Sequence, residues 1–461
     1  MPQCPLVNTS EPSGELPSDC PLLVIGGGPA GAATAATAAL AGMDVTVVDM
    51  QDFPRDKTCG DGLTPRAVHA LTRLWGGDPA ATSPRTGTTG VLAGRPSIRG
   101  LALHGFGGSV TTPWPDLPAF PPRGSAVPRT QLDAALLDFA ADAGARVVTG
   151  WKAVDVTLTG ASTAGVVESV TFRRGREERT VRCGTLVLAE GVRSGIARKL
   201  GVQWLRGMVH GIAARSYCPT PRGDDPWIHS HLELRDAEGT AQPGYGWIFP
   251  LGDATGGSDA KGVNLGCGAL STSKRPAKVN VKKLLTHYAD QVRGEWELGE
   301  PEDIASALLP MGGAVTRVAG VNWAAVGDTA ALVNPLNGEG IDYALESAQD
   351  LVEYLPDAAR TPRGLADIWP AHLRGRYGDA FSLARRAATV LTMPGLLSAV
   401  GPLGFRGPLA PRLMGAATRL MGNLVTPEDR DLTARAWLTA GKLSVGHDRF
   451  RHPESRPLFG A

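Results

Sequence analysis

The 461-residue sequence lacks several features that would define its class at once. No run reaches about 18 apolar residues, so we expect no transmembrane helix. The six cysteines form no CxxC pair and no zinc-ligand spacing, which favours reduced thiols in a cytosolic protein. A net charge of only +1 gives no argument for a nucleic-acid partner. Residues 1–19 lack the basic start and apolar run of a signal peptide and are predicted to be a disordered lead-in.

What is present is a strand, a glycine turn, an alanine-rich helix and a second strand near the N-terminus. In order, these cover residues 22–25, 26–31, 32–41 and 45–48. A Gly-x-Gly-x-x-Gly turn that follows a strand and opens a helix is the dinucleotide-binding fingerprint. The sequence therefore predicts a Rossmann-like unit that binds a nucleotide cofactor.

Each feature of the fingerprint has a physical role in this unit. Gly26 permits the tight turn, Gly28 lets a pyrophosphate approach the backbone, and Gly31 lets the helix pack closely on the strand. The N-terminus of the helix presents unpaired N–H groups to the phosphates. Asp49, which ends the second strand, can accept hydrogen bonds from a ribose diol.

Hydrophobic periodicity divides the rest of the chain into separated segments. We predict an α/β fold in which a Rossmann-like domain carries an inserted β-sheet substrate domain and a C-terminal helical region. The expected segments are 20–75, 124–201 and 312–355 for the nucleotide domain, 76–123 and 202–311 for the β domain, and 356–461 for the helices.

Two later motifs identify the nucleotide as FAD. Leu186 to Arg198 resembles the strand–Asp-Gly–Ser–Arg motif of flavoproteins related to p-hydroxybenzoate hydroxylase, but Glu190 replaces the Asp, so no nicotinamide role is assigned to it. Val326 to Asp342 resembles the Gly-Asp motif of the same proteins, and Asp328 at the end of a buried strand suits a ribityl chain. The helix that starts near Gly340 would direct its N–H groups at the flavin N1–C2=O edge.

Two further motifs resemble the geranylgeranyl reductase family, whose members saturate isoprenoid double bonds with reduced FAD. One is the loop Pro54 to Pro65, which contains Cys-Gly-Asp-Gly, and the other is Tyr-x-Trp-x-Phe-Pro at residues 245–250. Within the family the chain is most similar to actinobacterial menaquinone reductases, which hydrogenate one isoprene unit of the menaquinone tail. The segments 53–68, 225–234 and 306–314 carry this closer resemblance.

The resemblance implies a set of cofactor-binding residues along the chain. They are Gly26, Gly28, Ala30 and Gly31 for the pyrophosphate, Asp49 for the ribose, Val154 for the adenine, Arg129 for the phosphate or ribityl region, and Cys59, Gly60, Gly62, Asp328, Gly340 and Ile341 for the flavin end. Taken alone, Arg129 is equally typical of a solvated arginine in a first helical turn.

The substrate and catalytic residues are expected around the same loop. Tyr245, Trp247 and Phe249 alternate, so they share one face of a strand, which is either ordinary sheet core or the wall of an apolar tunnel. Cys59 is either a small buried hydrophobe or a group that shapes the alkene pocket. We name Tyr245 and Cys59 as the catalytic candidates, with Tyr245 as a possible proton donor. The electron donor is not identified.

A menaquinone tail lies in a bilayer, so the resemblance also implies a peripheral protein at the cytoplasmic face of the membrane. Residues 371–420 carry seven arginines against the single acid Asp379, with apolar stretches at 390–397 and 413–417 between them. Such a basic, apolar, helical region suits an interfacial anchor on anionic lipid. It equally suits a helical cap over the substrate domain with a solvated basic face.

Two other functions are compatible with the motifs. One is an FAD-dependent aromatic monooxygenase or halogenase of the same fold, although halogenases carry Trp-x-Trp-x-Ile-Pro where this chain has Tyr245-Gly-Trp-Ile-Phe-Pro. The other is a non-catalytic isoprenoid-binding flavoprotein, against which the intact glycines and Asp328 argue.

Overall fold

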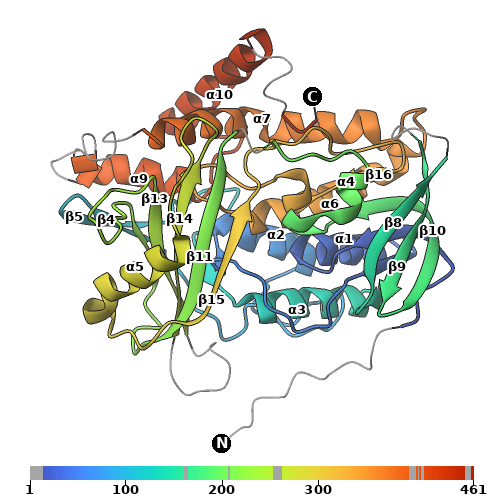
Figure 1. Cartoon of the computed structure of the whole chain (residues 1–461), viewed down its shortest axis with the longest axis horizontal. Helices are drawn as coiled ribbons and strands as arrows, with labels where there is room; N and C mark the ends of the chain where they lie inside the picture. Colours follow the sequence, from blue (N-terminus) through green and yellow to red (C-terminus); the bar gives the residue numbers. More distant parts are fainter. Residues whose placement is uncertain are drawn as a thin grey trace, which may run out of the picture.

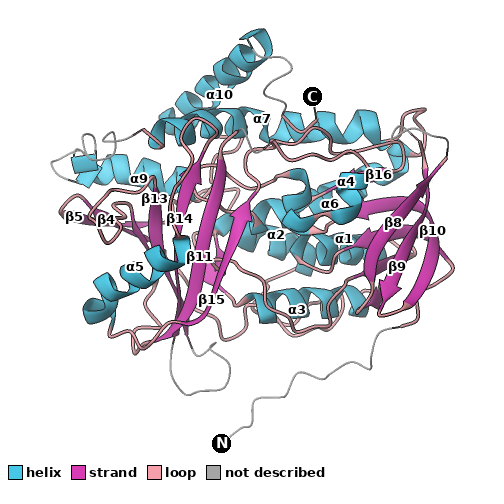
Figure 2. Cartoon of the chain, viewed as in Figure 1, coloured by secondary structure: helices cyan, strands magenta, loops and turns pink. Residues whose placement is uncertain are grey.

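The computed structural model describes residues 14–159, 165–205, 208–252, 262–393, 401–402, 404–405, 410–451 and 458–460. Two separate seven-stranded sheets lie side by side, and helices of the C-terminal region run across the top of both in the view of Figures 1 and 2. Most of the predicted lead-in lies outside the described residues, and the first strand already begins at Asp19.

The first sheet contains the expected nucleotide-binding unit. Its strands run β7 (Arg146–Val148), β2 (Val45–Val48), β1 (Asp19–Ile25), β10 (Glu177–Leu188), β9 (Val167–Arg174) and β8 (Lys152–Leu158), with β16 (Trp323–Ala325) also paired to β10. Strands β7, β2, β1, β10 and β16 pair in parallel, whereas β8, β9 and β10 form an antiparallel meander. Strand β10 is continuous through the exposed Gly184, which interrupts the apolar pattern of the sequence but not the ladder.

The helices of this part pack directly on the first sheet and on one another. They are α1 (Pro29–Leu40), α2 (Pro65–Trp75), α3 (Arg129–Asp142), the short α4 (Gly195–Lys199) and α6 (Ile341–Ala358). Helix α1 is buried almost all round, because the sheet, α3 and α6 surround it, and its alanines allow that close approach. Helix α6 continues through Pro356 to Ala358, since a proline in the last turn removes only one terminal hydrogen bond.

The second sheet combines strands from two distant segments of the chain. Its order is β15 (Glu302–Leu309), β11 (His210–Pro219), β14 (Gly262–Ser271), β13 (Gly244–Gly252), β12 (Trp227–His231), β4 (Gly100–Gly105) and β5 (Gly108–Pro113). Only the β12–β4 pair is parallel. Helix α5 (Val281–Trp296) covers one face. On this strand order we propose that 76–123 and 202–311 form one substrate-side domain.

Short elements join the two parts around the loop that follows β2. Strands β3 (Gly62–Leu63) and β6 (Ser125–Ala126) form a two-stranded sheet there, and the single turns η1 (Gly191–Arg193) and η2 (Gly327–Ala330) lie next to each other in the first part. The loop that carries Cys59 therefore leads from the nucleotide-binding unit straight to the second sheet.

The C-terminal region is helical, as predicted, in α7 (Leu365–Leu391), α9 (Ala410–Met421) and α10 (Leu432–Arg451). Of the helix breaks expected at Pro394, Pro402 and Pro408, the first and the last lie outside the described residues, and Pro402 is helical. Helix α9 packs on β5 and β4, and α10 packs on α7 (Figure 1). No helix in the described part of the chain is both long and apolar enough to span a bilayer.

Most of the C-terminal arginines that the structure describes are paired within the molecule. Arg376 contacts Glu346 and Asp350, and Arg386 contacts Asp448. Two more pair in the same way: Arg385 with Asp448, and Arg419 with Asp429 and Asp431. These four arginines hold the helices together, so they do not form the solvated basic face that the sequence suggested.

Candidate active site

The glycine turn after β1 has the geometry that a dinucleotide requires. A side chain at Gly26, whose φ is 103°, would place its Cβ 2.3 Å from the Ala189 carbonyl oxygen. A Cβ at Gly31 would lie 1.7 Å from the Gly26 carbonyl oxygen. Gly28 is the N-cap of α1 and supplies no side-chain cap, so the first N–H groups of the helix are available to a phosphate. Ala30, the second residue of α1, is buried.

Asp49 lies at the carboxyl end of β2, as predicted, and is nearly buried. Its Oδ2 accepts a hydrogen bond of 2.7 Å from the Gly27 N–H, and its Oδ1 accepts one of 2.9 Å from the Gln51 N–H. The carboxylate is therefore fixed beside the glycine turn. The backbone at the start of β8 is close as well, because the Trp151 N–H donates to the Asp49 carbonyl. Val154 lies at an irregularity of the β8–β9 register, where the ladder is interrupted.

Two cations from the Cys59 loop lie beside the carboxylates that were assigned to the cofactor, and the sequence reasoning assigned neither. We call the region from the glycine turn and Asp49 to Asp328 and Gly340 the cofactor crevice. The Arg55 guanidinium is 2.9 Å from an Asp133 oxygen and 4.0 Å from an Asp49 oxygen. The Lys57 ammonium is 3.2 Å from Asp328 Oδ2. The sequence could have indicated both residues, because they alternate with turn residues in the loop that follows the second strand of the nucleotide-binding unit. Together they supply positive charge between the two carboxylates that were assigned to the cofactor.

Arg129 is buried, with 3% of its surface exposed, so it is not a solvated first-turn arginine. Its Nε and Nη2 donate to the two carboxylate oxygens of Asp133 at 2.7 Å each. Burial raises the pKa of the Cys59 thiol above its usual value, and the nearby Arg129 opposes this only in part. Cys59 is therefore a neutral thiol at physiological pH.

The Cys59 loop lies directly on the aromatic face of β13. A Cβ at Gly60 would come 2.6 Å from the Phe249 ring, and one at Gly62 would come 3.1 Å from it. The rings of Tyr245, Trp247 and Phe249 follow one another at centroid separations of 6.0 Å. The structure thus brings together the two motifs on which the family resemblance depends.

The Gly-Asp motif of residues 326–342 contacts the same row of aromatic side chains at Tyr245. The Tyr245 hydroxyl donates to the Asn337 carbonyl in the loop before α6. Gly340 is the N-cap of α6 and offers no side-chain cap, and its Cβ position is 3.4 Å from Asp328 Oδ1. Asp328 and the first residues of α6, including Ile341, therefore lie at one end of the crevice, with Tyr245 beside them. Burial raises the pKa of the Tyr245 hydroxyl, so it remains protonated.

Glu190, which replaces the Asp of the related motif, has a local structural role. Its carboxylate accepts hydrogen bonds from the N–H groups of the first turn of α4, at 2.9, 3.1 and 3.0 Å. It is thus an acidic helix cap. The decision to give it no nicotinamide role agrees with this geometry.

A buried polar cluster next to Cys59 was missed by the sequence analysis. The carboxylate of Asp61 accepts hydrogen bonds from the Tyr217 hydroxyl and from Asn264 Nδ2, both at 2.8 Å. Asn264 also donates to the Cys59 carbonyl and accepts from the Trp247 indole N–H. Tyr217 and Asn264 are far from Asp61 in the sequence, so no local pattern could have identified the cluster.

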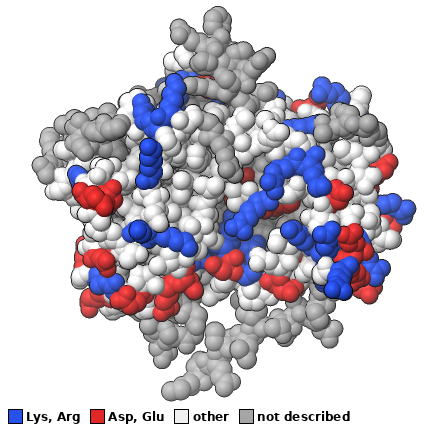
Figure 3. Space-filling model, in the orientation of Figure 1, with Lys and Arg blue, Asp and Glu red and all other residues white. Residues whose placement is uncertain are grey.

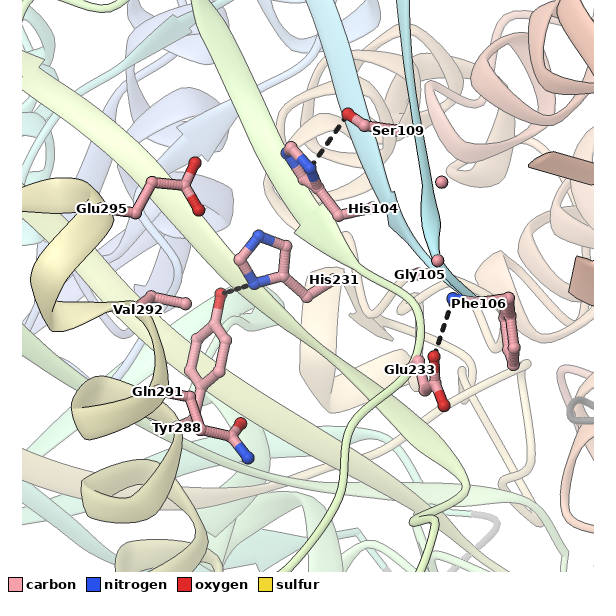
Figure 4. A pocket seen from close by; sticks show the side chains of 12 residues that line it. His104, Gly105, Phe106, Ser109, His231, Glu233, Tyr288, Gln291, Val292 and Glu295 are labelled. Carbon is pink, nitrogen blue, oxygen red and sulfur yellow. Dashed lines mark hydrogen bonds between the residues drawn. The ribbon is translucent and has the colours of Figure 1, made fainter. Parts of the chain in front are cut away.

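A separate cavity of about 570 Å³ lies on the opposite face of the second sheet (Figure 4). It is bordered by His104, His231, Tyr288 and Glu295, and Tyr288 donates or accepts a hydrogen bond with His231 at 2.8 Å. The Tyr288 ring covers Gly246, which faces away from its neighbours Tyr245 and Trp247. The sheet therefore separates this cavity from the Cys59 loop.

The crevice fits FAD by its own residues. The N-terminus of α1 meets it without a side-chain cap, and at the start of α6 the Ile341 N–H donates to the Glu339 carboxylate. The buried Asp49 and the partly exposed Asp328 lie towards its two ends. The Arg55 and Lys57 cations face these carboxylates, and the aromatic strand closes the end near Cys59. A fold and site of this kind define an FAD-dependent oxidoreductase.

Comparisons with known proteins agree with this class. The FAD binding domain family model matches residues 19–241. A menaquinone reductase of Mycolicibacterium smegmatis is 49% identical over 92% of this chain and 96% of its own length, and one of Mycobacterium tuberculosis is 48% identical over 93% and 97%. The chain belongs to the menaquinone reductase family.

The fold is also found in solved structures of low sequence identity. A geranylgeranyl bacteriochlorophyll reductase-like protein of Thermoplasma acidophilum superimposes with a TM-score of 0.66 at 18% identity, covering 95% of this chain and 98% of that one. A flavin-dependent brominase gives a TM-score of 0.66 at 17% identity, covering 94% and 99%. The predicted α/β fold with an FAD-binding part and the FAD cofactor are confirmed.

Proposed function

We propose that this protein saturates an isoprene double bond of a polyprenyl lipid, the side chain of menaquinone, with reduced FAD. The observation that carries the proposal is the identity of 49% to a menaquinone reductase over nearly the full length of both chains. A second relative, a digeranylgeranylglycerophospholipid reductase of Methanopyrus kandleri, is 26% identical over 80% of this chain and 90% of its own. The names of both relatives point to reduction, and the second names a prenyl-chain lipid.

The chemistry requires two things from the protein. An isolated trisubstituted alkene has no carbonyl to make it electrophilic, so positive charge develops at its tertiary carbon during reduction. Reduced FAD supplies the hydride when it is bound. The chain must then hold the alkene in a site that excludes water and must provide a proton for the other carbon.

The residues assigned to FAD remain our proposal for the site. We place the pyrophosphate at Gly26, Gly28, Ala30 and Gly31, the adenosine at Asp49 and Val154, and the flavin end at Cys59, Gly60, Gly62, Asp328, Gly340 and Ile341. Arg55 and Lys57 add charge for the phosphates, supported by their pairs with Asp49 and Asp328. Arg129 is paired with Asp133, so we do not propose it as a free cation for the phosphates.

Tyr245, Trp247 and Phe249 form the proposed substrate wall. Their contiguous rings lie against Gly60 and Gly62, and they offer a hydrocarbon chain a broad apolar face beside the flavin end. The catalytic roles named for Tyr245 and Cys59 stay predictions. Because the Tyr245 hydroxyl donates to the Asn337 carbonyl, we propose that it orients the loop before α6.

Lipid analysis of a deletion strain tests the proposed function. In the organism that carries this chain, deletion is expected to leave menaquinone with one more double bond in its side chain, and the plasmid-borne gene is expected to restore saturation. Unchanged saturation in the deletion strain would contradict the proposal. NADPH oxidation that is stimulated by a phenol would support the aromatic monooxygenase, and colourless purified protein would support the non-catalytic carrier.

We also propose that the protein meets the membrane through apolar side chains of its C-terminal region. Five of the large apolar side chains that are exposed in the described residues lie there: Val390, Met393, Leu413, Leu432 and Leu443. In the face drawn in Figure 3, most acidic side chains lie in the lower half, on the left and on the right, and a few lie at the upper right. Exposed apolar groups on helices are the feature that inserts at a lipid interface.

Vesicle binding tests this contact. Leu413→Glu together with Leu432→Glu is expected to reduce co-sedimentation with anionic vesicles by about tenfold, because two inserted leucines contribute on the order of 1–2 kcal/mol. Val166→Glu changes an exposed apolar residue on the first sheet and is the matched control, which should bind like wild type. Equal loss in both proteins would show that charge alone is responsible and would contradict the proposed surface.

A further inference from the structure

Asp61 is a fully buried acid in the loop that meets the flavin end of the crevice. It lies between Gly60 and Gly62, two residues after Cys59. Its backbone is left-handed, with a φ of 60°. Its Oδ2 accepts hydrogen bonds from Tyr217 and Asn264, whereas its Oδ1 is buried with no hydrogen-bond partner among the described residues. One oxygen of this carboxyl therefore accepts two hydrogen bonds, and the other accepts none from the described residues.

The second sheet is built to hold this side chain. Phe249, Asn264 and Tyr217 are cross-strand neighbours on β13, β14 and β11, so they form one row across the face that meets the Cys59 loop. Phe249 packs under Gly60 and Gly62, and the other two bind the carboxyl between those glycines. The same row thus positions both the loop and the acid.

A permanently ionised carboxylate is a poor choice for this position. Burying a charge, or leaving a buried acceptor unpaired, is costly, whereas a protonated carboxyl carries only the smaller cost of a buried hydroxyl. If the row served only to dock the two domains, an asparagine would accept the same bonds without charge. An acid at this point offers what an amide does not, namely a transferable proton.

The groups around Asp61 suit an acid that gives up its proton and recovers it. Burial raises its pKa to about 6, and the hydrogen bonds from Asn264 and Tyr217 and the charges of Arg129 and Arg215 act in the opposite direction. Two other titratable groups lie near it, and burial raises the pKa of both, so the Cys59 thiol and the Tyr217 hydroxyl are protonated. Arg215 itself is paired with Asp56, which is 46% exposed. Both ionisation states are thus accessible near neutral pH.

On the basis of the proposed function, we propose that Asp61 is the proton donor for the double bond. As the hydride from the reduced cofactor reaches the tertiary carbon, the O–H bond of the Asp61 carboxyl breaks and a new C–H bond forms at the adjacent CH carbon. The alkene gains one hydride and one proton, and Asp61 becomes a carboxylate. Tyr217 and Asn264 hold that carboxylate until a solvent proton restores the acid. Tyr217 and Asn264 are positioning residues.

The holoenzyme variant Asp61→Asn tests the proposal. Asparagine keeps the volume and accepts the Tyr217 and Asn264 hydrogen bonds but carries no transferable proton. We expect normal FAD content and normal reduction by dithionite, with a single-turnover rate of double-bond reduction lowered about 100-fold or more. The wild-type rate should fall as pH rises above about 6, and the rate of the variant should not. Asp61→Glu should recover part of the rate. A variant with FAD bound and wild-type rate would overturn the proposal.

A readout without turnover distinguishes this proposal from the proposed function. Because the folded-state pKa of Asp61 lies above its unfolded value, its contribution to stability is present at low pH and is lost as pH rises through about 6. Asp61→Asn should therefore raise the unfolding temperature relative to wild type by more near about pH 8 than near about pH 4, which is close to the unfolded pKa of an aspartate. Infrared spectra of the wild type should contain a carboxylic acid band that disappears over this range and is missing in the variant.

These measurements remain decisive if the protein reduces no polyprenyl lipid. The proposed function then fails, while the infrared and unfolding titrations still report on Asp61. A wild type without a titrating band that depends on Asp61 would overturn the proton-donor assignment, even if the lipid is reduced. Tyr217→Phe, which removes one hydrogen bond but keeps the acid, should shift the pH profile upward rather than abolish the rate.

Discussion

Gly31→Val is expected to yield a colourless protein that retains no FAD and no reductase activity. A Cβ at Gly31 would lie 1.7 Å from the Gly26 carbonyl oxygen, so the start of α1 must move away from the turn after β1. The pyrophosphate depends on that turn and on the N–H groups at the start of the helix. Bound FAD is measured by the flavin absorbance of the purified protein, relative to its protein concentration.

Gly375→Ala is the matched control for this substitution. Gly375 lies in α7, where an added Cβ meets nothing within 4 Å. Alanine in a helix interior is favourable by up to about 1 kcal/mol relative to glycine, so this variant should be fully yellow. A Gly31→Val protein that binds FAD stoichiometrically would contradict the assignment of the glycine turn.

Arg66→Met is expected to lower the free energy of unfolding by about 3 kcal/mol. The Arg66 guanidinium donates to both carboxylate oxygens of Glu346, at 2.9 and 2.8 Å, and to the Asn423 carbonyl at 2.9 Å. It joins α2 to α6 and to the loop after α9. Its loss leaves Glu346 buried with only Arg376 and Tyr377 near its carboxylate. Urea or thermal unfolding measures the difference.

The control is an exposed pair of the same chemistry. Arg173→Met removes the partner of Glu178 on the hairpin of β9 and β10, where both side chains are about half exposed. Such a pair contributes less than about 1 kcal/mol. The proximity of Arg66 lowers the pKa of Glu346, so the contribution of the buried pair is present above the unfolded pKa of a glutamate and is lost as the pH falls. Equal destabilisation by both variants would refute the distinction.

Local sequence patterns predicted the nucleotide-binding unit and its cofactor well. Residues 45–48 form the expected strand, and the glycines lie where the fingerprint requires them, because each role is set by neighbours within one turn. The alternation of Tyr245, Trp247 and Phe249 correctly placed their rings in one row. Contacts that depend on a repeating pattern can be read from a single chain.

The buried polar cluster around Asp61 depends on contacts between residues that are far apart in the sequence. Asp61 and Asn264 are separated by 203 residues, and only the order of the second sheet brings them together. The C-terminal arginines were misjudged for the same reason, since their partners Asp448 and Glu346 lie outside the segment whose charge was counted. Charge counted along a chain does not tell whether a partner lies on another helix.

Anaerobic reduction of a purified lipid tests the central claim most directly. Holoprotein whose FAD has been reduced with dithionite is mixed, after removal of excess reductant, with menaquinone that has a fully unsaturated side chain. We expect the flavin to be reoxidised and mass spectrometry to find a product heavier by one H2, with the gain confined to fragments of the side chain. Flavin that stays reduced and menaquinone of unchanged mass would contradict the proposed function.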